Sequence, residues 1–232
     1  MLYIHMGAGA GDLDPKANFR CGFTEFIKKN YKKNDIIFAV EANKLNIKKL
    51  KKCWENYPKT KILNLAIVGN YLNKKKKTLY YTERDKPHYQ VCSMDINHVK
   101  KHYPRCIIKK ISVKTIKINR FFEKYVKKKC INFLSLDLEG IDYEIVMSIN
   151  FKKYNIKNLS IEHLPLTKIQ KIKIIHHLNV SGYSYCGSGY DHNNFDYLFK
   201  KKKIFFNRVL SRLLFIISRK HLNIFNKLLF NR

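Results

Sequence analysis

The sequence predicts an α/β protein in which a parallel β-sheet carries helices on both faces. Residues 2–6 form an apolar run that stops at alternating glycines, and residues 36–40 form a second apolar run that ends at Glu41. A third run covers residues 62–68, and amphipathic segments separate the three runs. Such an alternation of buried strands with helical segments is typical of parallel α/β sheets.

The first strand leads into Gly7, Gly9 and Gly11. Glycines at a strand end allow the backbone to approach a ligand closely because they lack a Cβ. The dinucleotide fingerprint would place another glycine where Asp12 stands, and the chain has no G-x-x-x-x-G-K-[ST] motif. The turn therefore indicates a nucleotide or nucleoside-like ligand, with an ordinary glycine-rich turn as the alternative.

Glu41 is expected at the carboxyl end of the second strand. In a doubly wound sheet this position lies beside the first glycine loop, so the carboxylate can accept hydrogen bonds from both hydroxyls of a ribose. Glu41 follows Gly7 by 34 residues, which is longer than a minimal unit. We therefore expect an inserted loop over residues 12–22, either a lid that contacts substrate or a solvated surface loop.

The remaining elements continue the alternation. Apolar residues at helical spacing predict helices over 24–33, 45–54, 121–126 and 166–178. Apolar or alternating runs predict strands over 62–68, 131–136 and 156–162, an edge or half-buried strand over 111–118, and a closing hairpin of 183–185 and 195–199. The segment 73–110 departs from this rhythm, so we expect an insertion that shapes a substrate pocket. Its histidines, among them His88, His98 and His102, are expected at the surface rather than as ligands or bases.

Composition limits the classes of function. The chain has 232 residues, 45% of them hydrophobic, which suits one domain with an appendage. Its formal charge of +30 suggests nucleic acid or an anionic membrane as a partner, although lysine occurs throughout with Asn, Ile, Tyr and Phe, as in an AT-rich coding sequence. The six cysteines form no CxxC pair and no Cys/His cluster, so we expect no metal and reduced, cytoplasmic thiols. A core strand that starts at residue 2 leaves no room for a signal peptide.

Carboxylates follow the later strands as well. The run 131–136 ends in Asp137-Leu138-Glu139-Gly140, and the run 156–162 ends in Glu162-His163. The carboxyl ends of parallel strands meet at the ligand-binding edge of such a sheet. A solvated turn is the alternative for residues 137–140.

Several motifs, taken in order, resemble one family. GAGAGD, AVEAN, NLAIVGN, KTIKINRFFEKY, INFLSLDLEGIDYEIV and LSIEH are together similar to the FkbM-type class I S-adenosylmethionine-dependent methyltransferases. The resemblance covers roughly residues 2–199, and LDLEGIDYEIV is its most specific part. It implies a Rossmann-like, seven-stranded, mostly parallel sheet and methyl transfer to a hydroxyl, often on glycan sugars or natural products. The family commonly has an acidic residue near the end of the first strand, where this chain has His5.

The resemblance implies S-adenosylmethionine as cofactor. By that similarity the glycine turn lies under the methionine part, Glu41 on the ribose, and residues 64–66 near the adenine. The candidate cofactor-binding residues are Gly7, Ala8, Gly9, Gly11, Glu41, Ala42, Asn64, Ala66 and Asp137.

Methyl transfer requires an acceptor oxygen in line with the methyl group and a destination for one proton. His163, at a strand end and with a side chain that titrates near neutrality, is our candidate base. Asp137 is the second candidate, as base or as the group that positions the acceptor. Loss of the proton to solvent remains an alternative that needs no base.

Residues 200–232 differ from the preceding domain, which we assign to residues 1–199. This segment has ten Lys or Arg and no Asp or Glu, and its apolar residues fall on one helical face. A basic amphipathic helix of this kind is suited to an anionic membrane surface. A helix docked on the domain and an oligomer contact are the alternatives.

Three classes of function follow. The first is an O-methyltransferase that acts on a small molecule or a glycan sugar, in the cytoplasm or peripherally at the inner membrane surface. The second is a nucleic-acid methyltransferase, which the dispersed basic residues and the lack of an NPPY-type or catalytic-cysteine motif make unlikely. The third is a non-catalytic protein that binds a membrane or a partner on a methyltransferase fold.

Overall fold

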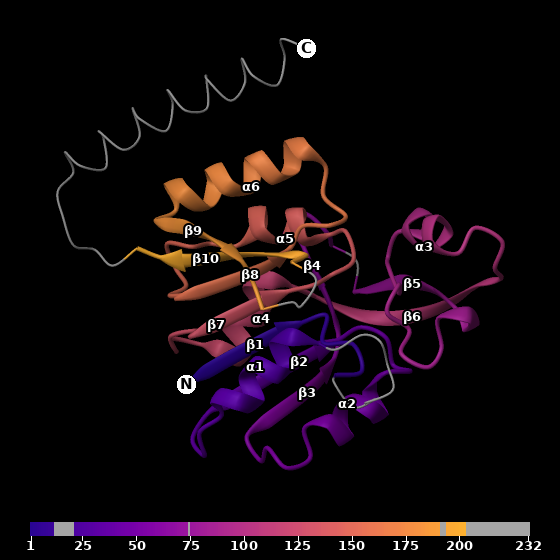
Figure 1. Ribbon diagram of the computed structural model, residues 1–232, viewed down its shortest axis with the longest axis horizontal. Coiled ribbons are helices and arrows are strands. Elements are labelled where there is room, and N and C mark those ends of the chain that lie inside the picture. Colours follow the sequence, from indigo (N-terminus) through magenta and orange to yellow (C-terminus); the bar gives the residue numbers. More distant parts are fainter. Residues whose placement is uncertain (12–20, 74, 191–193, 203–232) are drawn as a thin grey trace, which may run out of the picture. The chain divides into compact units, whose positions relative to one another are not determined.

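A computed structural model describes residues 1–11, 21–73, 75–190 and 194–202. Helices and strands alternate over most of this part of the chain (Figure 1). The strands are β1 (Leu2–Met6), β2 (Ile36–Glu41), β3 (Thr60–Asn64), β4 (Ala66–Val68), β5 (Lys76–Thr82), β6 (Ile108–Lys117), β7 (Phe133–Leu136), β8 (Asn158–Glu162), β9 (Tyr183–Ser188) and β10 (Asp196–Lys201). The helices are α1 (Gly22–Asn30), α2 (Ile47–Cys53), η1 (Glu83–Asp85), α3 (Ile96–His102), α4 (Ile118–Phe121), η2 (Phe122–Val126), α5 (Asp142–Ser148) and α6 (Lys168–Val180).

The large sheet has seven strands in the order β3-β2-β1-β7-β8-β10-β9. The first five of these run parallel, whereas β10 is antiparallel to both β8 and β9. The expected seven-stranded, mostly parallel sheet with a closing hairpin is confirmed. The carboxyl ends of β1, β2, β3, β7 and β8 consequently share one edge of the sheet.

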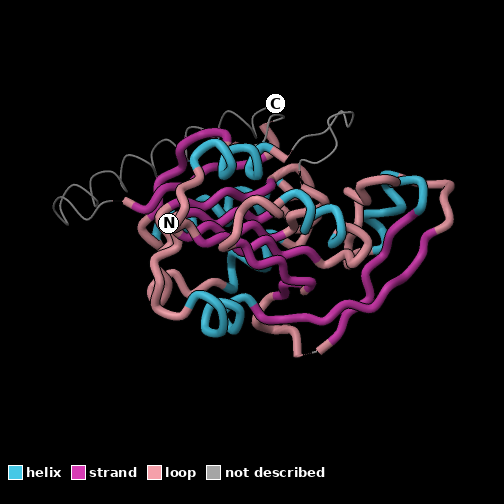
Figure 2. The backbone as a smooth tube through the Cα atoms, turned by 90° about the horizontal axis from the view of Figure 1, so that it is seen from below, coloured by secondary structure: helices cyan, strands magenta, loops and turns pink. Residues whose placement is uncertain are grey.

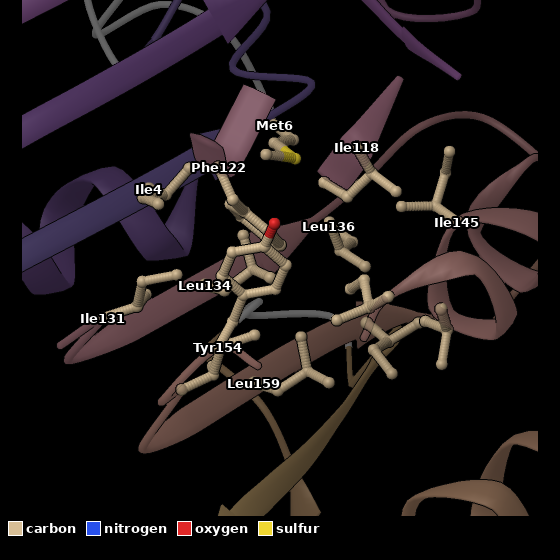
Figure 3. Packing of buried hydrophobic residues seen from close by; sticks show 14 of the residues in the cluster. Ile4, Met6, Ile118, Phe122, Ile131, Leu134, Leu136, Ile145, Tyr154 and Leu159 are labelled. Atoms are coloured by element: carbon tan, nitrogen blue, oxygen red, sulfur yellow. The ribbon is translucent and has the colours of Figure 1, made fainter. Parts of the chain in front are cut away.

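Because side chains alternate along each strand, the hydrophobic core has one part on each face of this sheet. Ile4 and Met6 of β1 pack with Leu134 of β7 against α4, η2 and α5 (Figure 3). Ile174 and Leu178 of α6 belong to the same cluster. Tyr3 of β1 and Phe133 of β7 point to the other face, where they pack with α1 and α2. Each apolar side chain of this size contributes about 1.5–3 kcal/mol on burial. Helices on both faces are therefore confirmed.

A second sheet of three strands, in the order β4-β6-β5, corrects one expectation and refines another. The run 62–68 is not one strand, because Leu65 separates β3 from β4. Whereas β3 pairs with β2 in the large sheet, β4 pairs in parallel with β6 in the second sheet. Asn64 marks the break, because its Nδ2 donates to the main-chain oxygens of Glu41 and Ala42, both at 2.9 Å. The edge or half-buried strand predicted over 111–118 falls largely in β6, which is the central strand of the second sheet and is half-buried, with Val113 as its one buried residue.

The expected insertion consists of β5, η1, α3 and the first part of β6. In Figure 1 β5, β6 and α3 lie together beside the large sheet, and the long antiparallel ribbon is visible again in Figure 2. The Ser93 hydroxyl donates to the main-chain oxygen of Glu139 at 3.1 Å. This contact ties the insertion to the loop after β7.

Two expectations lie largely outside the described residues, namely the loop over 12–22 and the basic segment 200–232. In the part of the chain that the structure does describe, no helix combines the length and the apolar character needed to cross a membrane.

Candidate functional site

A cavity of about 260 Å³ opens at the edge of the large sheet where the parallel strands end. Its walls come from the ends of β1, β2, β7 and β8, from the start of β10 and from the insertion. Of the residues proposed from sequence, those that line the cavity are Gly7, Ala8, Gly9, Gly11, Glu41, Ala42, Ala66 and Asp137. Asn64 and His163 do not line it.

The glycine turn is shaped by its neighbours on both sides. The amides of Gly7 and Ala8 both donate to the main-chain oxygen of Val40, at 2.9 and 3.0 Å. Gly7 has a φ of +85°, and a Cβ built on it would lie 1.6 Å from the main-chain oxygen of Asp137. No side chain fits at this position. The turn therefore holds β1, β2 and β7 in close register beneath the cavity.

Glu41 is held by main-chain donors. Its Oε2 accepts from the Gly9 amide at 2.7 Å, and its Oε1 accepts from the Asn43 amide at 2.6 Å. The side chain is only 7% exposed. Burial raises the pKa of this carboxyl to about 7, although the hydrogen bonds from Asn43 and Gly9 act in the opposite direction. Each oxygen keeps a lone pair with which to accept a ligand hydroxyl.

Asn64 supports this arrangement from outside the cavity. Its side-chain amide bonds to the backbone at Glu41 and Ala42, as described above, and so fixes the end of β2. Ala66, two residues further along the chain, does line the cavity. Asn64 therefore stabilises the backbone that carries Glu41, next to the part of the cavity where the family resemblance implies the adenine.

The opposite side of the cavity is crowded with carboxyl groups. Asp137 ends β7, Glu162 ends β8 and Asp196 begins β10, so three neighbouring strands each supply one, and Glu139 supplies a fourth. Asp137 and Glu162 are hydrogen-bonded to each other. Burial and the nearby carboxylates raise the pKa of both groups well above the ordinary range. The protonated form of each group is therefore favoured relative to that of an exposed carboxyl.

Asp142 lies behind this wall at the start of α5. It is fully buried and accepts a hydrogen bond from the Leu138 amide at 3.1 Å. Burial raises its pKa to about 7. The carboxylate thereby fixes the backbone of the loop that carries Asp137 and Glu139.

The imidazole of His163 points elsewhere. It stacks on Tyr197 with the ring centroids 3.9 Å apart, and its Nε2 lies 3.1 Å from the main-chain oxygen of Asn194. Burial lowers the pKa of this histidine. Successive residues at a strand end point in opposite directions, so Glu162 rather than His163 lines the cavity. The geometry offers no support for His163 as the base.

His5 occupies the wall between the glycine turn and α1. It is 2% exposed, and burial lowers its pKa to about 4, so the imidazole is neutral. Its Nε2 lies 3.9 Å from Sγ of Cys21, the residue that caps α1, while Nδ1 has no hydrogen-bond partner among the described residues. A buried ring nitrogen without a partner among the described residues can bond to a polar group of a ligand.

The insertion supplies residues that the sequence did not single out. Ser93 and Met94 line the cavity, as do His88 and His102, of which His102 is exposed, as expected, and His88 is half-buried. His98 stands just behind them, with Nε2 2.9 Å from Oε2 of Glu139. The only signal in the sequence was the loss of regular periodicity over 73–110, which locates an insertion but not its contacts.

The fold thus places this cavity, with a glycine turn and a buried carboxylate in its walls, at the carboxyl ends of the parallel strands. The Methyltransferase FkbM domain matches residues 5–199, so the chain belongs to the FkbM methyltransferase family. A comparison with curated proteins finds no match.

Among solved structures the chain is similar to three methyltransferase-related proteins at low identity. For precorrin-6y C5,15-methyltransferase from Geobacter metallireducens GS-15 the identity is 12%, with 87% of this chain and 80% of that chain covered and a TM-score of 0.40. For a human methyltransferase 10 domain containing protein the values are 10%, 85%, 69% and 0.39. For Aeropyrum pernix fibrillarin with natively bound S-adenosyl-L-methionine they are 10%, 86%, 64% and 0.41. Similarities this weak carry no information about the substrate.

Proposed function

We propose that this protein is an S-adenosylmethionine-dependent O-methyltransferase that acts on a hydroxyl group of a small molecule or a glycan sugar. The observation that carries the proposal is the buried carboxylate of Glu41, which two main-chain amides hold beside the glycine turn in a single cavity. Membership of the FkbM methyltransferase family supports it.

The residues of the cavity fit the donor. Glu41 has free lone pairs for the two ribose hydroxyls, and the absence of a side chain at Gly9 leaves space above the turn, since a Cβ there would meet nothing within 4 Å. The partnerless Nδ1 of His5 supplies a further hydrogen-bonding position near the turn. Ala42 and Ala66 present small apolar surfaces for a base.

When bound, S-adenosylmethionine supplies a methyl group on a positively charged sulfur. The chain's own residues then have two tasks, to orient an acceptor hydroxyl and to receive its proton. The Asp137–Glu162 pair is placed for both, because both carboxyls line the cavity and are hydrogen-bonded to each other. A carboxylate with a raised pKa is a stronger base than an ordinary one, which favours proton transfer as the O–CH₃ bond forms.

The test is methyl transfer from donor labelled on the methyl group to three kinds of acceptor: free sugars, purified glycans and RNA. We expect label in a sugar-bearing acceptor with wild-type protein, strong loss with Asp137→Asn, and little change with His163→Ala. Label in RNA alone would overturn the proposal in favour of the nucleic-acid alternative. Transfer that needs His163 but not Asp137 would overturn the assignment of the base.

The basic segment 200–232 belongs to the same proposal as a peripheral membrane anchor for an enzyme of lipid-linked glycans. Its ten cations without a single acid support attraction to anionic lipid. Co-sedimentation with vesicles that contain or lack anionic lipid, for the full chain and for a chain ending at residue 202, tests this step. Equal sedimentation of the two chains would remove it from the proposal.

A further inference from the structure

Helix α6 has apolar side chains on two opposite faces. Ile174 and Leu178 are fully buried in the core, where the helix packs against α5 and β9. Ile169 and Ile172 are instead 66% and 55% exposed, and Val180, at the end of the helix, is 64% exposed. Figure 1 shows α6 as the outer layer above α5 and β9. A helix on the surface of a globular domain normally has one apolar stripe, so folding alone does not account for the outer one.

The exposed apolar residues of α6 form a group. Most other large hydrophobic side chains that are exposed in the described residues stand singly, as Tyr71 and Ile107 do. Such single side chains are ordinary on a protein surface, whereas several on one face mark an interaction site. At 3.6 residues per turn, the exposed apolar residues of α6 share its outer side. These residues are Ile169, Ile172, Ile175 and Val180.

The surroundings of this group are positively charged. Helix α6 contains Lys168, Lys171 and Lys173 and has no Asp or Glu. Lys168 and Lys173 are exposed and lie on either side of the outer apolar residues. Over residues 151–190 the sequence has a single acid, Glu162, and this side chain lines the cavity. The outer face of α6 is therefore apolar along its middle and basic along both edges.

We propose that the outer face of α6 binds a membrane surface that contains anionic lipids. Isoleucines enter the boundary between headgroups and acyl chains, while lysines beside them reach the lipid phosphates. This surface belongs to the folded domain and is separate from the anchor proposed for residues 200–232. The inference does not depend on methyl transfer, because it concerns contact with lipid alone.

Charge favours lipid over the other occupants of such a face. A second copy of the chain would bring two sets of the same lysines together. The segment 203–232 has seven Lys or Arg and no acid, so it would be repelled as well. Nucleic acid would be attracted by the lysines, but its phosphate backbone gives the isoleucines no apolar partner. An anionic membrane satisfies both the charge and the apolar side chains.

The proposed surface begins near the cavity. Strand β8 ends at the edge of the sheet where the cavity opens, and a short loop connects it to α6. Leu164 in this loop is 52% exposed and also lines the cavity. A membrane bound along α6 therefore comes within one short loop of the cavity.

The first experiment identifies the surface that contacts lipid. The full chain is mixed with phosphatidylcholine vesicles that contain or lack phosphatidylglycerol, together with a lipid that carries a photoactivatable group on its acyl chain. We expect cross-links within residues 168–180 on the vesicles with phosphatidylglycerol and few on the neutral ones. Cross-links confined to residues 203–232, or to other parts of the domain, would overturn the proposal.

The second experiment measures partition of full-chain variants into the anionic vesicles. Ile172→Asp should reduce the partition coefficient at least about five-fold, because it removes apolar surface and adds a negative charge. Ile107→Asp is the matched control, since Ile107 is 83% exposed in the insertion, and its partition should stay within about two-fold of wild type. Thermal melting confirms that both variants are folded.

Both variants retain residues 203–232, so any anchoring by that segment is the same in each. Equal partition of Ile172→Asp and Ile107→Asp would overturn the proposal. So would a dimer that Ile172→Asp disrupts, or RNA binding that it weakens, if the wild type does not partition into the vesicles.

Discussion

The two sides of the cavity are built by different means. On the proposed donor side, at the ends of β1 and β2, the polar groups belong mainly to the backbone, and two amides satisfy the one carboxylate. On the proposed acceptor side, at the ends of β7 and β8 and the start of β10, side-chain carboxyls crowd together and raise one another's pKa values. The donor side is defined by main-chain shape, whereas the acceptor side is defined by charge. Substitutions should therefore have different consequences on the two sides.

The largest effect is expected from Gly7→Ala. The new Cβ would overlap the main-chain oxygen of Asp137 and would force φ +85° on a residue with a side chain. We expect a loss of more than about 3 kcal/mol in unfolding free energy, or no recoverable folded protein, measured by urea denaturation. Gly182→Ala is the matched control, since Gly182 has φ +88° with nothing within 4 Å, and it should lose about 1 kcal/mol. Equal losses in the two variants would refute the close approach at Gly7.

The second-largest effect is expected at acidic pH, where protonation of His5 lowers the free energy of unfolding. The folded protein holds this histidine neutral down to a pKa of about 4, whereas the unfolded chain binds a proton near the ordinary value of 6.5. The contribution of His5 to the free energy of unfolding is therefore full above pH 6.5 and decreases as the pH falls. The loss reaches about 2 kcal/mol at pH 5.

His5→Gln isolates this contribution, because all other titrating groups stay in place. Urea denaturation at pH 7.5 and pH 5 should show a smaller loss of stability in the variant than in the wild type by about that amount. The same pH dependence in both proteins would mean that His5 is not held neutral by burial.

A third prediction concerns the pH dependence of donor binding. Burial raises the pKa of Glu41 to about 7, and only the ionised form accepts hydrogen bonds from two hydroxyl groups. Affinity for S-adenosylmethionine should therefore fall by up to about ten-fold, or about 1.4 kcal/mol, between pH 8 and pH 6. Glu41→Gln should bind more weakly at pH 8 and lose this slope. A slope that persists in Glu41→Gln would place the responsible titration elsewhere.

The smallest effect is expected at Asn64. Asn64→Ala removes two hydrogen bonds to the backbone that positions Glu41 and should cost about 1 kcal/mol of stability, with a modest loss of donor affinity. Asn97→Ala changes an exposed asparagine of α3 and serves as the control. If thermal melting and calorimetry show the two variants alike, Asn64 does not brace the donor side.

The sequence locates the residues that line the Glu41 side of the cavity better than those that line the carboxyl-rich side, for a physical reason. Gly7 and Glu41 each belong to a local sequence pattern, an apolar strand that ends in a glycine turn or in a carboxylate. Both residues line the cavity. Glu162 and His163 are adjacent on one strand end, and only the twist of that end decides which of them points inward. The sequence favoured His163 for its titration, whereas the structure turns Glu162 into the cavity.

Non-local pairing accounts for the other differences. The run 62–68 has uniform apolar character, but its second half pairs with β6, which lies far along the chain. Ser93 and His102 reach the cavity because the insertion folds back on the loop after β7. Neither contact leaves a periodic signal in the sequence, so the strand break and the insertion's side of the cavity appear only in the structure.

The most direct test of the central claim, that this cavity holds S-adenosylmethionine with its ribose on Glu41, is calorimetry with wild type and Glu41→Ala at pH 8. We predict saturable binding with one site, weakened by about 1.5–3 kcal/mol in the variant, because a buried carboxylate that accepts charge-assisted bonds is removed. Asp95→Ala, which changes the exposed cap of α3, should bind like the wild type. Absence of binding by folded wild-type protein, or equal affinities of wild type and Glu41→Ala, would contradict the account.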